Sequence, residues 1–91
     1  MASIRIQHKH QQPDHLVRES LHKLTEELHR ELGLTCVWGT NHIDFHRSGA
    51  SGKLTIQPHQ VEVDIKLSMM LSMFEKKIRS TIEEYCKTHL P

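Results

Sequence analysis

Aromatic residues are scarce in this chain, and its charges almost cancel. It has one Trp, one Tyr and two Phe, and 12 Lys and Arg stand against 11 Asp and Glu, for a formal net charge of +1. A nucleic-acid-binding surface needs a basic field or exposed aromatic rings for base stacking. Trp38 and Phe45 instead alternate with polar residues, which places them on the inner face of a sheet. The composition therefore argues against nucleic acid as a partner.

Cysteine is also rare, and long apolar runs are missing. Cys36 and Cys86 lie 50 positions apart with no C-x-x-C pair, which disfavours a zinc ribbon, a thioredoxin motif and a disulfide framework. The most apolar stretch, 67–74, is far shorter than the roughly 20 residues of a membrane span. Residues 1–12 contain no apolar core of a signal peptide. We therefore expect a soluble, cytoplasmic protein with reduced thiols and no membrane span.

The usual catalytic signatures are missing as well, including G-x-S-x-G, the P-loop and G-x-G-x-x-G. Cys36 alternates in step with Leu34 and Trp38, so its thiol should face the core, and Cys86 falls on the flank of the last expected helix. A nucleophilic thiol needs partial exposure and an activating neighbour. We expect no enzymatic activity, no catalytic residue and no cofactor.

Histidine is unusually frequent, with nine copies. His42 and His46 share one face of an expected strand, but their Cα atoms would stand ~13 Å apart, which is a poor chelate. His15, His22 and His29 repeat every seven residues along an expected helix, with a rise of about 10.5 Å per step, too far for one ion. We therefore predict no metal site and interpret the histidines as polar residues of the surface.

Apolar periodicity predicts two helices. The first runs from Pro13 to Leu32, and Gly33 supplies a left-handed stop. Most of its apolar residues fall on one stripe: Leu16, Val17, Leu21, Leu24, Leu28 and Leu32. The second helix begins at Ser72, where Ser72 and Glu75 match a capping box, and ends near His89. Its expected stripe is Leu71, Phe74, Ile78, Ile82 and Tyr85.

Alternation of apolar and polar residues predicts five strands. The first contains Ile4 and Ile6, and the others cover 34–38, 42–46, 53–57 and 61–67, with turns at 39–41, 48–52 and 58–59. The order β-α-β-β-β-β-α predicts an α+β fold. We expect a two-layer sandwich with a mainly antiparallel sheet and both helices on one face. Residues 1–91 should form a single domain, and the sequence leaves open which strand pairs with the first.

An apolar cluster precedes the second helix and is our candidate binding set. It consists of Met69, Met70, Leu71, Met73 and Phe74. Met73 lies off the expected helical stripe by roughly 100°, and methionine adapts to irregular or varied apolar surfaces. An exposed patch here would bind a partner, a lipid-like surface or a second copy. The alternative is that these residues close the open end of the sandwich.

Two stretches of the sequence carry a family resemblance. Residues 46–54, HRSGASGKL, and residues 61–67, VEVDIKL, resemble the polyhydroxyalkanoic acid system family, as do Ile4-Arg5-Ile6 and Trp38. The R-S-G-x-S-G run is the most specific part, and the resemblance covers almost the whole chain. The family consists of short bacterial proteins, some of which are encoded beside genes for polyhydroxyalkanoate storage polyester. The resemblance therefore implies a link to that polymer, and it implies no catalytic residues.

Three functions are compatible with this sequence. The first is a non-enzymatic accessory protein that binds a hydrophobic surface or a protein partner, with polyhydroxyalkanoate granules as a candidate surface. The second is a small hydrophobic-ligand-binding module of helix-grip type, with a cavity between Trp38, Phe45, Val63 and Phe74. The third is a homodimer that assembles through sheet edges and the methionine cluster.

Overall fold

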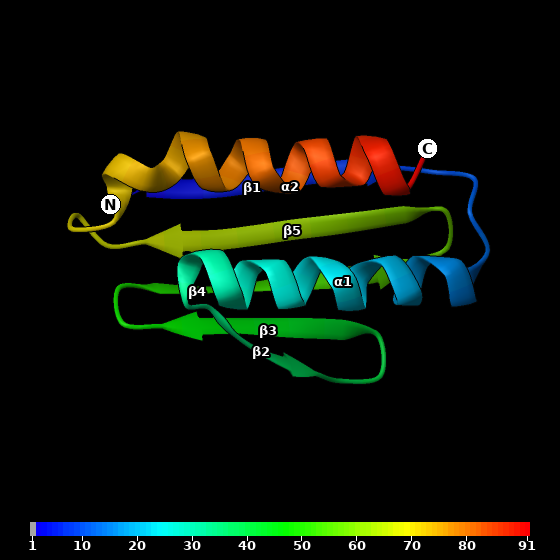
Figure 1. Cartoon of the computed structure of the whole chain (residues 1–91), viewed down its shortest axis with the longest axis horizontal. Coiled ribbons are helices and arrows are strands. Elements are labelled where there is room, and N and C mark those ends of the chain that lie inside the picture. The colour runs from blue at the N-terminus through cyan, green and yellow to red at the C-terminus, as the bar shows by residue number, and fades with distance from the viewer. Residues whose placement is uncertain (1) are drawn as a thin grey trace.

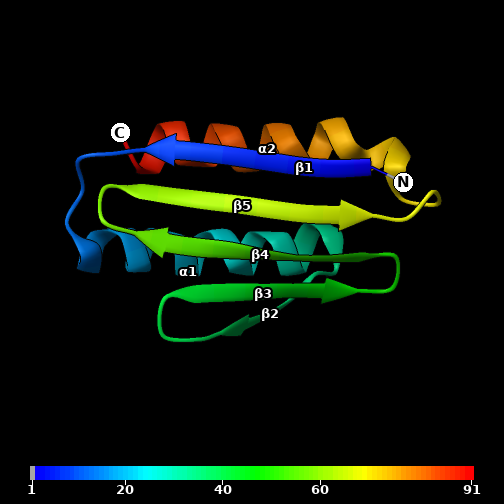
Figure 2. The ribbon, with the colours of Figure 1, turned by 180° about the vertical axis from the view of Figure 1, so that it is seen from behind.

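A five-stranded antiparallel sheet forms one layer of the computed structural model and two helices form the other (Figure 1); residues 2–91 are described. In chain order the elements are β1 (Ala2–Lys9), α1 (Asp14–Leu32), β2 (Thr35–Trp38), β3 (His42–Arg47), β4 (Ala50–Gln57), β5 (Gln60–Leu67), the 3-10 turn η1 (Ser72–Phe74) and α2 (Glu75–His89). The reverse view shows the strands in front of both helices (Figure 2). The predicted α+β class and element order are confirmed.

The strands lie in the order β1-β5-β4-β3-β2, so β1 and β2 form the two edges of the sheet. Strands β2 to β5 make a meander, and β1 adds to its free side by pairing with β5, with Ile4 opposite Ile65 and Ile6 opposite Val63. Helix α1 connects the two edge strands across the inner face, and α2 lies over β1 (Figure 1). This answers the one pairing that the sequence left open.

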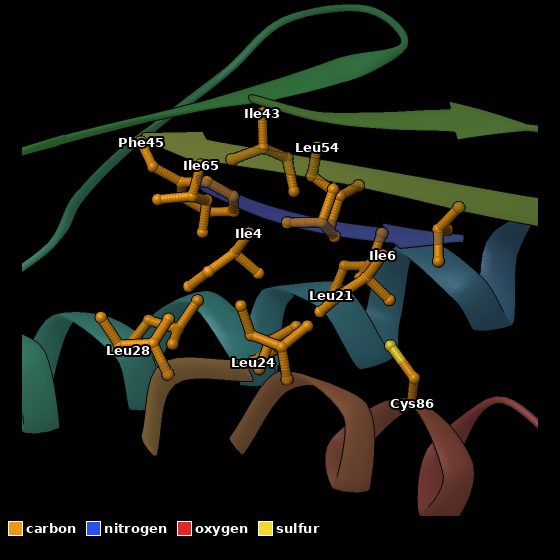
Figure 3. Close-up of a cluster of buried hydrophobic side chains, with 14 of the residues drawn as sticks. Ile4, Ile6, Leu21, Leu24, Leu28, Ile43, Phe45, Leu54, Ile65 and Cys86 are labelled. Atoms are coloured by element: carbon orange, nitrogen blue, oxygen red, sulfur yellow. The ribbon is translucent and has the colours of Figure 1, made fainter. Parts of the chain in front are cut away.

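One continuous apolar core fills the space between the layers. Side chains of the sheet, such as Ile43 and Leu54, point toward Leu21, Leu24 and Leu28 of α1 (Figure 3). All five are fully buried. The alternation that predicted the strands therefore also predicted which strand residues face the helices.

Helix α1 follows its expected boundaries. Pro13 stands at the cap before Asp14, and Gly33 ends the helix with φ of 70°, a left-handed conformation that glycine adopts without steric cost. Leu16 departs from the apolar stripe and is 40% exposed. It lies about 120° around the helix from the centre of the buried stripe, because each residue turns the helix by about 100°.

Helix α2 differs from the expectation in its start and in its buried face. The predicted capping box is wrong, because the α-helix begins at Glu75, no side chain caps it, and the Ser72 hydroxyl instead donates to the Met69 carbonyl at 2.8 Å. The buried residues are Ile78, Ile82 and Cys86, whereas Phe74 and Tyr85 are partly exposed. Extending α-helical spacing back through the 3-10 turn gave the wrong phase. Cys86 therefore lies in the core, as its sulfur does in Figure 3, and not on a flank.

The expected loop 48–52 is shorter than predicted. Only Ser48 and Gly49 form the turn, and β4 already begins at Ala50. Gly52 belongs to the strand, where a Cβ would come within 2.4 Å of the Asp64 carbonyl oxygen of β5. Glycine is required there by close approach of two backbones, and not by a loop.

Candidate functional site: the methionine-rich segment and the end pocket

The methionine-rich segment, residues 69–74, carries the chain from the end of β5 to the start of α2. Its backbone winds in successive tight turns, with Phe74 N–H donating to Leu71 O at 3.0 Å and Leu71 N–H donating to Ser68 O at 3.1 Å. A 3-10 turn has three residues per turn, so side chains at i and i+3 fall on one side. Met70 and Met73 therefore share one side, and Leu71 and Phe74 share another.

The methionines of this segment are largely exposed to solvent. Met69, Met70 and Met73 are 80%, 81% and 78% exposed, and Phe74 is 42% exposed. Leu71 is only half-buried and packs against the core. Such a group of neighbouring exposed apolar side chains is uncommon on a small soluble protein and marks a surface able to bind apolar material.

The β3–β4 turn packs against this segment through Gly49. Gly49 adopts φ of 87°, and its carbonyl accepts a hydrogen bond from the Ser68 N–H at 2.8 Å. A Cβ at this position would lie 2.9 Å from Ser68 Oγ and 3.1 Å from the nearest Leu71 side-chain carbon. Both the left-handed conformation and the close contact favour glycine. The turn within the R-S-G-x-S-G run thus supports the base of the methionine-rich segment.

Arg47, from the same run, ties the turn to the end of α1. Its Nη1 donates to the Leu32 carbonyl at 2.6 Å and its Nε donates to the Ser48 carbonyl at 3.3 Å. A cation at a helix C-terminus is favourable because the last carbonyls have no partner within the helix. The guanidinium is therefore held in a fixed position at this end of the sandwich.

An apolar pocket of about 280 Å³ opens between these elements; we call it the end pocket. It lies between the C-terminal end of α1 and the N-terminal end of α2, which lie at the same end of the sheet, at the left of Figure 1. The sheet contributes Ala50, Ile65 and Leu67 to its lining. The helices and their connections contribute Leu32, Gly33, Leu34, Leu71, Phe74 and Ile78. Its charged residues are Glu31, Arg47 and Lys77. The pocket is thus apolar inside and charged at three points.

The structure brings only part of the predicted residue set to this pocket. Leu71 and Phe74 line it, whereas Met69, Met70 and Met73 lie on the exposed side of the segment. Sequence reasoning missed Arg47, Ala50 and Lys77. A signal was present for Arg47, which is a specified position of the R-S-G-x-S-G run, whereas Ala50 stands at its unspecified position. The prediction of a turn over 48–52 assigned the run no part in a site.

The cavity expected between Trp38, Phe45, Val63 and Phe74 does not coincide with the end pocket. Phe45 and Val63 are buried in the packed core, and Trp38 stacks on His22 with ring centroids 4.1 Å apart. Of the four, only Phe74 borders the end pocket. The pocket lies at one end of the sandwich, whereas the buried leucines of α1 fill its middle.

Neither cysteine is set up as a nucleophile. Burial raises the pKa of the Cys86 thiol to about 11, with a smaller contribution from the Glu83 carboxylate, and burial also raises the pKa of Cys36. The thiolate, which is the reactive form, is thus disfavoured at both positions. Cys36 lies half-buried against the core, as its alternation predicted.

The interpretation of the histidines as polar surface residues is wrong for His10, which is buried and whose ring centroid lies 6.4 Å from that of His59. Other histidines have polar partners of their own. His42 Nε2 lies 3.4 Å from Asp44 Oδ2, and His29 Nδ1 lies 3.0 Å from the Leu34 carbonyl. Across residues 2–91 no three histidine, cysteine or acidic side chains converge as metal ligands. In that same part of the chain, neither helix is both long enough and apolar enough to cross a bilayer.

The fold and the site define a small α+β protein with two helices on one face of an antiparallel sheet and an apolar site at one end. A family model described as "Putative polyhydroxyalkanoic acid system protein" matches residues 4–90. The chain belongs to this family, which confirms the resemblance seen in the sequence. No curated protein and no solved structure matched the chain.

Proposed function

We propose that this protein is a non-enzymatic accessory protein that binds a hydrophobic surface through the methionine-rich segment. The exposure of Met69, Met70 and Met73 is the observation that carries the proposal. Membership of a family named for the polyhydroxyalkanoic acid system supports the storage polyester granule as that surface. A cytoplasmic location is part of the same proposal.

The size of the segment sets the strength of binding. Complete burial of each large apolar side chain is worth about 1.5–3 kcal/mol, so the three methionines supply on the order of 4.5–9 kcal/mol. Phe74 is already more than half-buried and adds less. Association itself costs roughly 4–15 kcal/mol. We therefore expect weak, reversible adsorption of single molecules, which becomes firm only when the surface is large or many copies bind.

Co-sedimentation with polyhydroxyalkanoate particles tests this proposal. The variant carrying both Met70→Glu and Met73→Glu should lose particle binding while its melting temperature stays unchanged, since both side chains already lie in solvent. Leu16→Glu is the matched control, because Leu16 is also an exposed apolar residue but lies on the first turn of α1, at the other end of the molecule. It should bind like the unmodified protein.

Other results would overturn the surface proposal. If the double variant binds particles as well as the unmodified chain, the segment is not the contact. If its melting temperature falls sharply, the methionines are packed against other residues in solution. If native mass spectrometry then finds the unmodified chain as a dimer and the double variant as a monomer, the homodimer hypothesis is supported instead.

The end pocket favours a second candidate function, the binding of a small hydrophobic ligand. Its volume of about 280 Å³ is near the lower end of ligand sites. Its walls come from both helices and from the inner strands β4 and β5, as in a helix-grip module. This function and surface binding are compatible, because Leu71 and Phe74 border the pocket on one side while Met70 and Met73 share the other side of the segment.

A further inference from the structure

We infer that the end pocket binds a medium-chain monocarboxylate, with the alkyl tail inside and the carboxylate at Arg47 and Lys77. The inference rests on the second candidate function above, that the pocket takes a small apolar ligand, and it adds the chemical class of that ligand. It uses residues of the R-S-G-x-S-G run that the surface-binding proposal leaves without a role.

The interior of the pocket fits an unbranched alkyl chain. Leu34, Ala50, Ile65 and Leu67 are all buried and offer no polar side-chain group to a ligand. The volume of about 280 Å³ is close to twice that of an apolar cavity of about 150 Å³ that accepts benzene. A tail of roughly six to ten carbon atoms therefore fits.

The charges at the pocket point to a single negative head group. Arg47 and Lys77 are cationic and Glu31 is anionic, so the pocket has one positive charge in excess. Arg47 is the better-placed partner, because its Nη1 and Nε are already fixed on the carbonyls of Leu32 and Ser48. Within residues 2–91 its Nη2 makes no hydrogen bond, and it remains available as a donor.

Lys77 complements this fixed cation with a mobile one. Its side chain is exposed on the first turn of α2 and borders the pocket. A long flexible ammonium side chain can follow a head group at varying depth, whereas the guanidinium stays in place. Glu31 opposes a second negative charge, so a dicarboxylate should bind more weakly than a monocarboxylate.

Isothermal titration calorimetry with octanoate and with 1-octanol tests the inference on the full chain. Octanoate should bind at one site per chain and more tightly than octanol. Lys77→Gln should weaken octanoate binding roughly 1.5- to fivefold, the range of an exposed charge pair, and leave octanol unchanged. Lys87→Gln is the matched control, since Lys87 is exposed on the last turn of the same helix, and it should change neither.

A second variant addresses the interior. Ala50→Leu adds side-chain volume within the pocket and should abolish binding of both ligands, and its melting temperature shows whether it remains folded. Equal binding of octanoate and octanol, with no effect of Lys77→Gln, would overturn the carboxylate assignment and leave the second candidate function in place. If neither ligand binds the folded, unmodified chain, both the inference and the second candidate function are overturned. The surface-binding proposal is tested separately, by co-sedimentation with particles.

Discussion

The guanidinium of Arg47 donates to the Leu32 carbonyl at 2.6 Å and thereby joins the β3–β4 turn to the last turn of α1. The two residues are 15 positions apart, and their contact closes one side of the end pocket. Gly49, two residues later in the same run, supports the other side by packing against Ser68 and Leu71. The most specific run of the family resemblance is thus a structural frame for the pocket.

Removing the Arg47 side-chain donor should lower stability measurably. A hydrogen bond with a charged donor is worth about 1.5–3 kcal/mol, and because Arg47 is only half-buried we expect Arg47→Met to lower the free energy of unfolding in urea by about 1–2 kcal/mol. Arg5→Met is the control, because Arg5 is largely exposed and its contact with Asp64 is a weak ion pair at 3.8 Å. Equal losses in the two variants would contradict the clamping role of Arg47.

Two glycines should respond very differently to alanine. Gly52→Ala would place a Cβ 2.4 Å from the Asp64 carbonyl oxygen and 2.7 Å from Ile65 Cα, both backbone atoms that cannot move without breaking the β4–β5 pairing. Gly33→Ala meets no atom closer than 3.7 Å and suffers only its positive φ, a cost of roughly 1–2 kcal/mol. Urea denaturation should therefore find the Gly52→Ala protein much less stable than the Gly33→Ala protein; a reversed order would refute the close-approach argument.

Stability should decrease in mild acid because of His10. Burial lowers the pKa of His10 below its ordinary value of 6.5, with smaller contributions from His8 and His59. Its Nδ1 accepts a hydrogen bond from the Gln12 N–H, and Nε2 is buried with no partner within residues 2–91. Between pH 6.5 and the lower folded-state pKa, the unfolded chain binds the proton more readily, so stability falls as pH falls through that range and is unaffected by His10 above it.

His10→Leu tests this assignment by comparison at two pH values. At pH 8 both proteins carry a neutral side chain at position 10, so their difference in unfolding free energy reflects packing and the lost hydrogen bond from the Gln12 N–H, without any contribution from protonation. At pH 5.5 the variant has no proton to gain, and the difference should move in its favour. A difference that stays constant between pH 8 and pH 5.5 would show that His10 does not contribute to the acid sensitivity.

Cys86 should be protected from a thiol reagent in the folded protein. Cys86 is fully buried with a pKa raised to about 11, whereas Cys36 is half-buried in the edge strand β2. In a Cys36→Ala protein at pH 8 we expect almost no labelling in the native state and one labelled thiol per chain in denaturing urea. Rapid labelling of the native Cys36→Ala protein would contradict the burial of Cys86.

Periodicity predicted the secondary structure well where one face of an element is buried. Strands β3 and β5 and helix α1 appear as expected because alternation and 3.6-residue spacing follow directly from which side chains meet the core. The errors concentrate between Leu71 and Glu75, where the chain forms a 3-10 turn before the helix. The same residues are compatible with either geometry, and in the structure Leu71 packs against the Gly49 turn.

The candidate site could be predicted only in part. The apolar character of residues 69–74 was visible in the sequence, because it depends on side-chain chemistry alone. Which of these residues face solvent was not, since that depends on the local turn geometry. Arg47, Ala50 and Lys77 were missed because they come from separate elements that only the packed sandwich brings together.

By itself, the amino-acid sequence determined the α+β class, the order of elements, the apolar face of the sheet and the family. These follow from local periodicity and from short runs of neighbouring residues. The tertiary structure alone decided that β1 pairs with β5, that Cys86 enters the core and that a pocket opens at one end. Each of these depends on contacts between residues distant in sequence, which local periodicity does not specify.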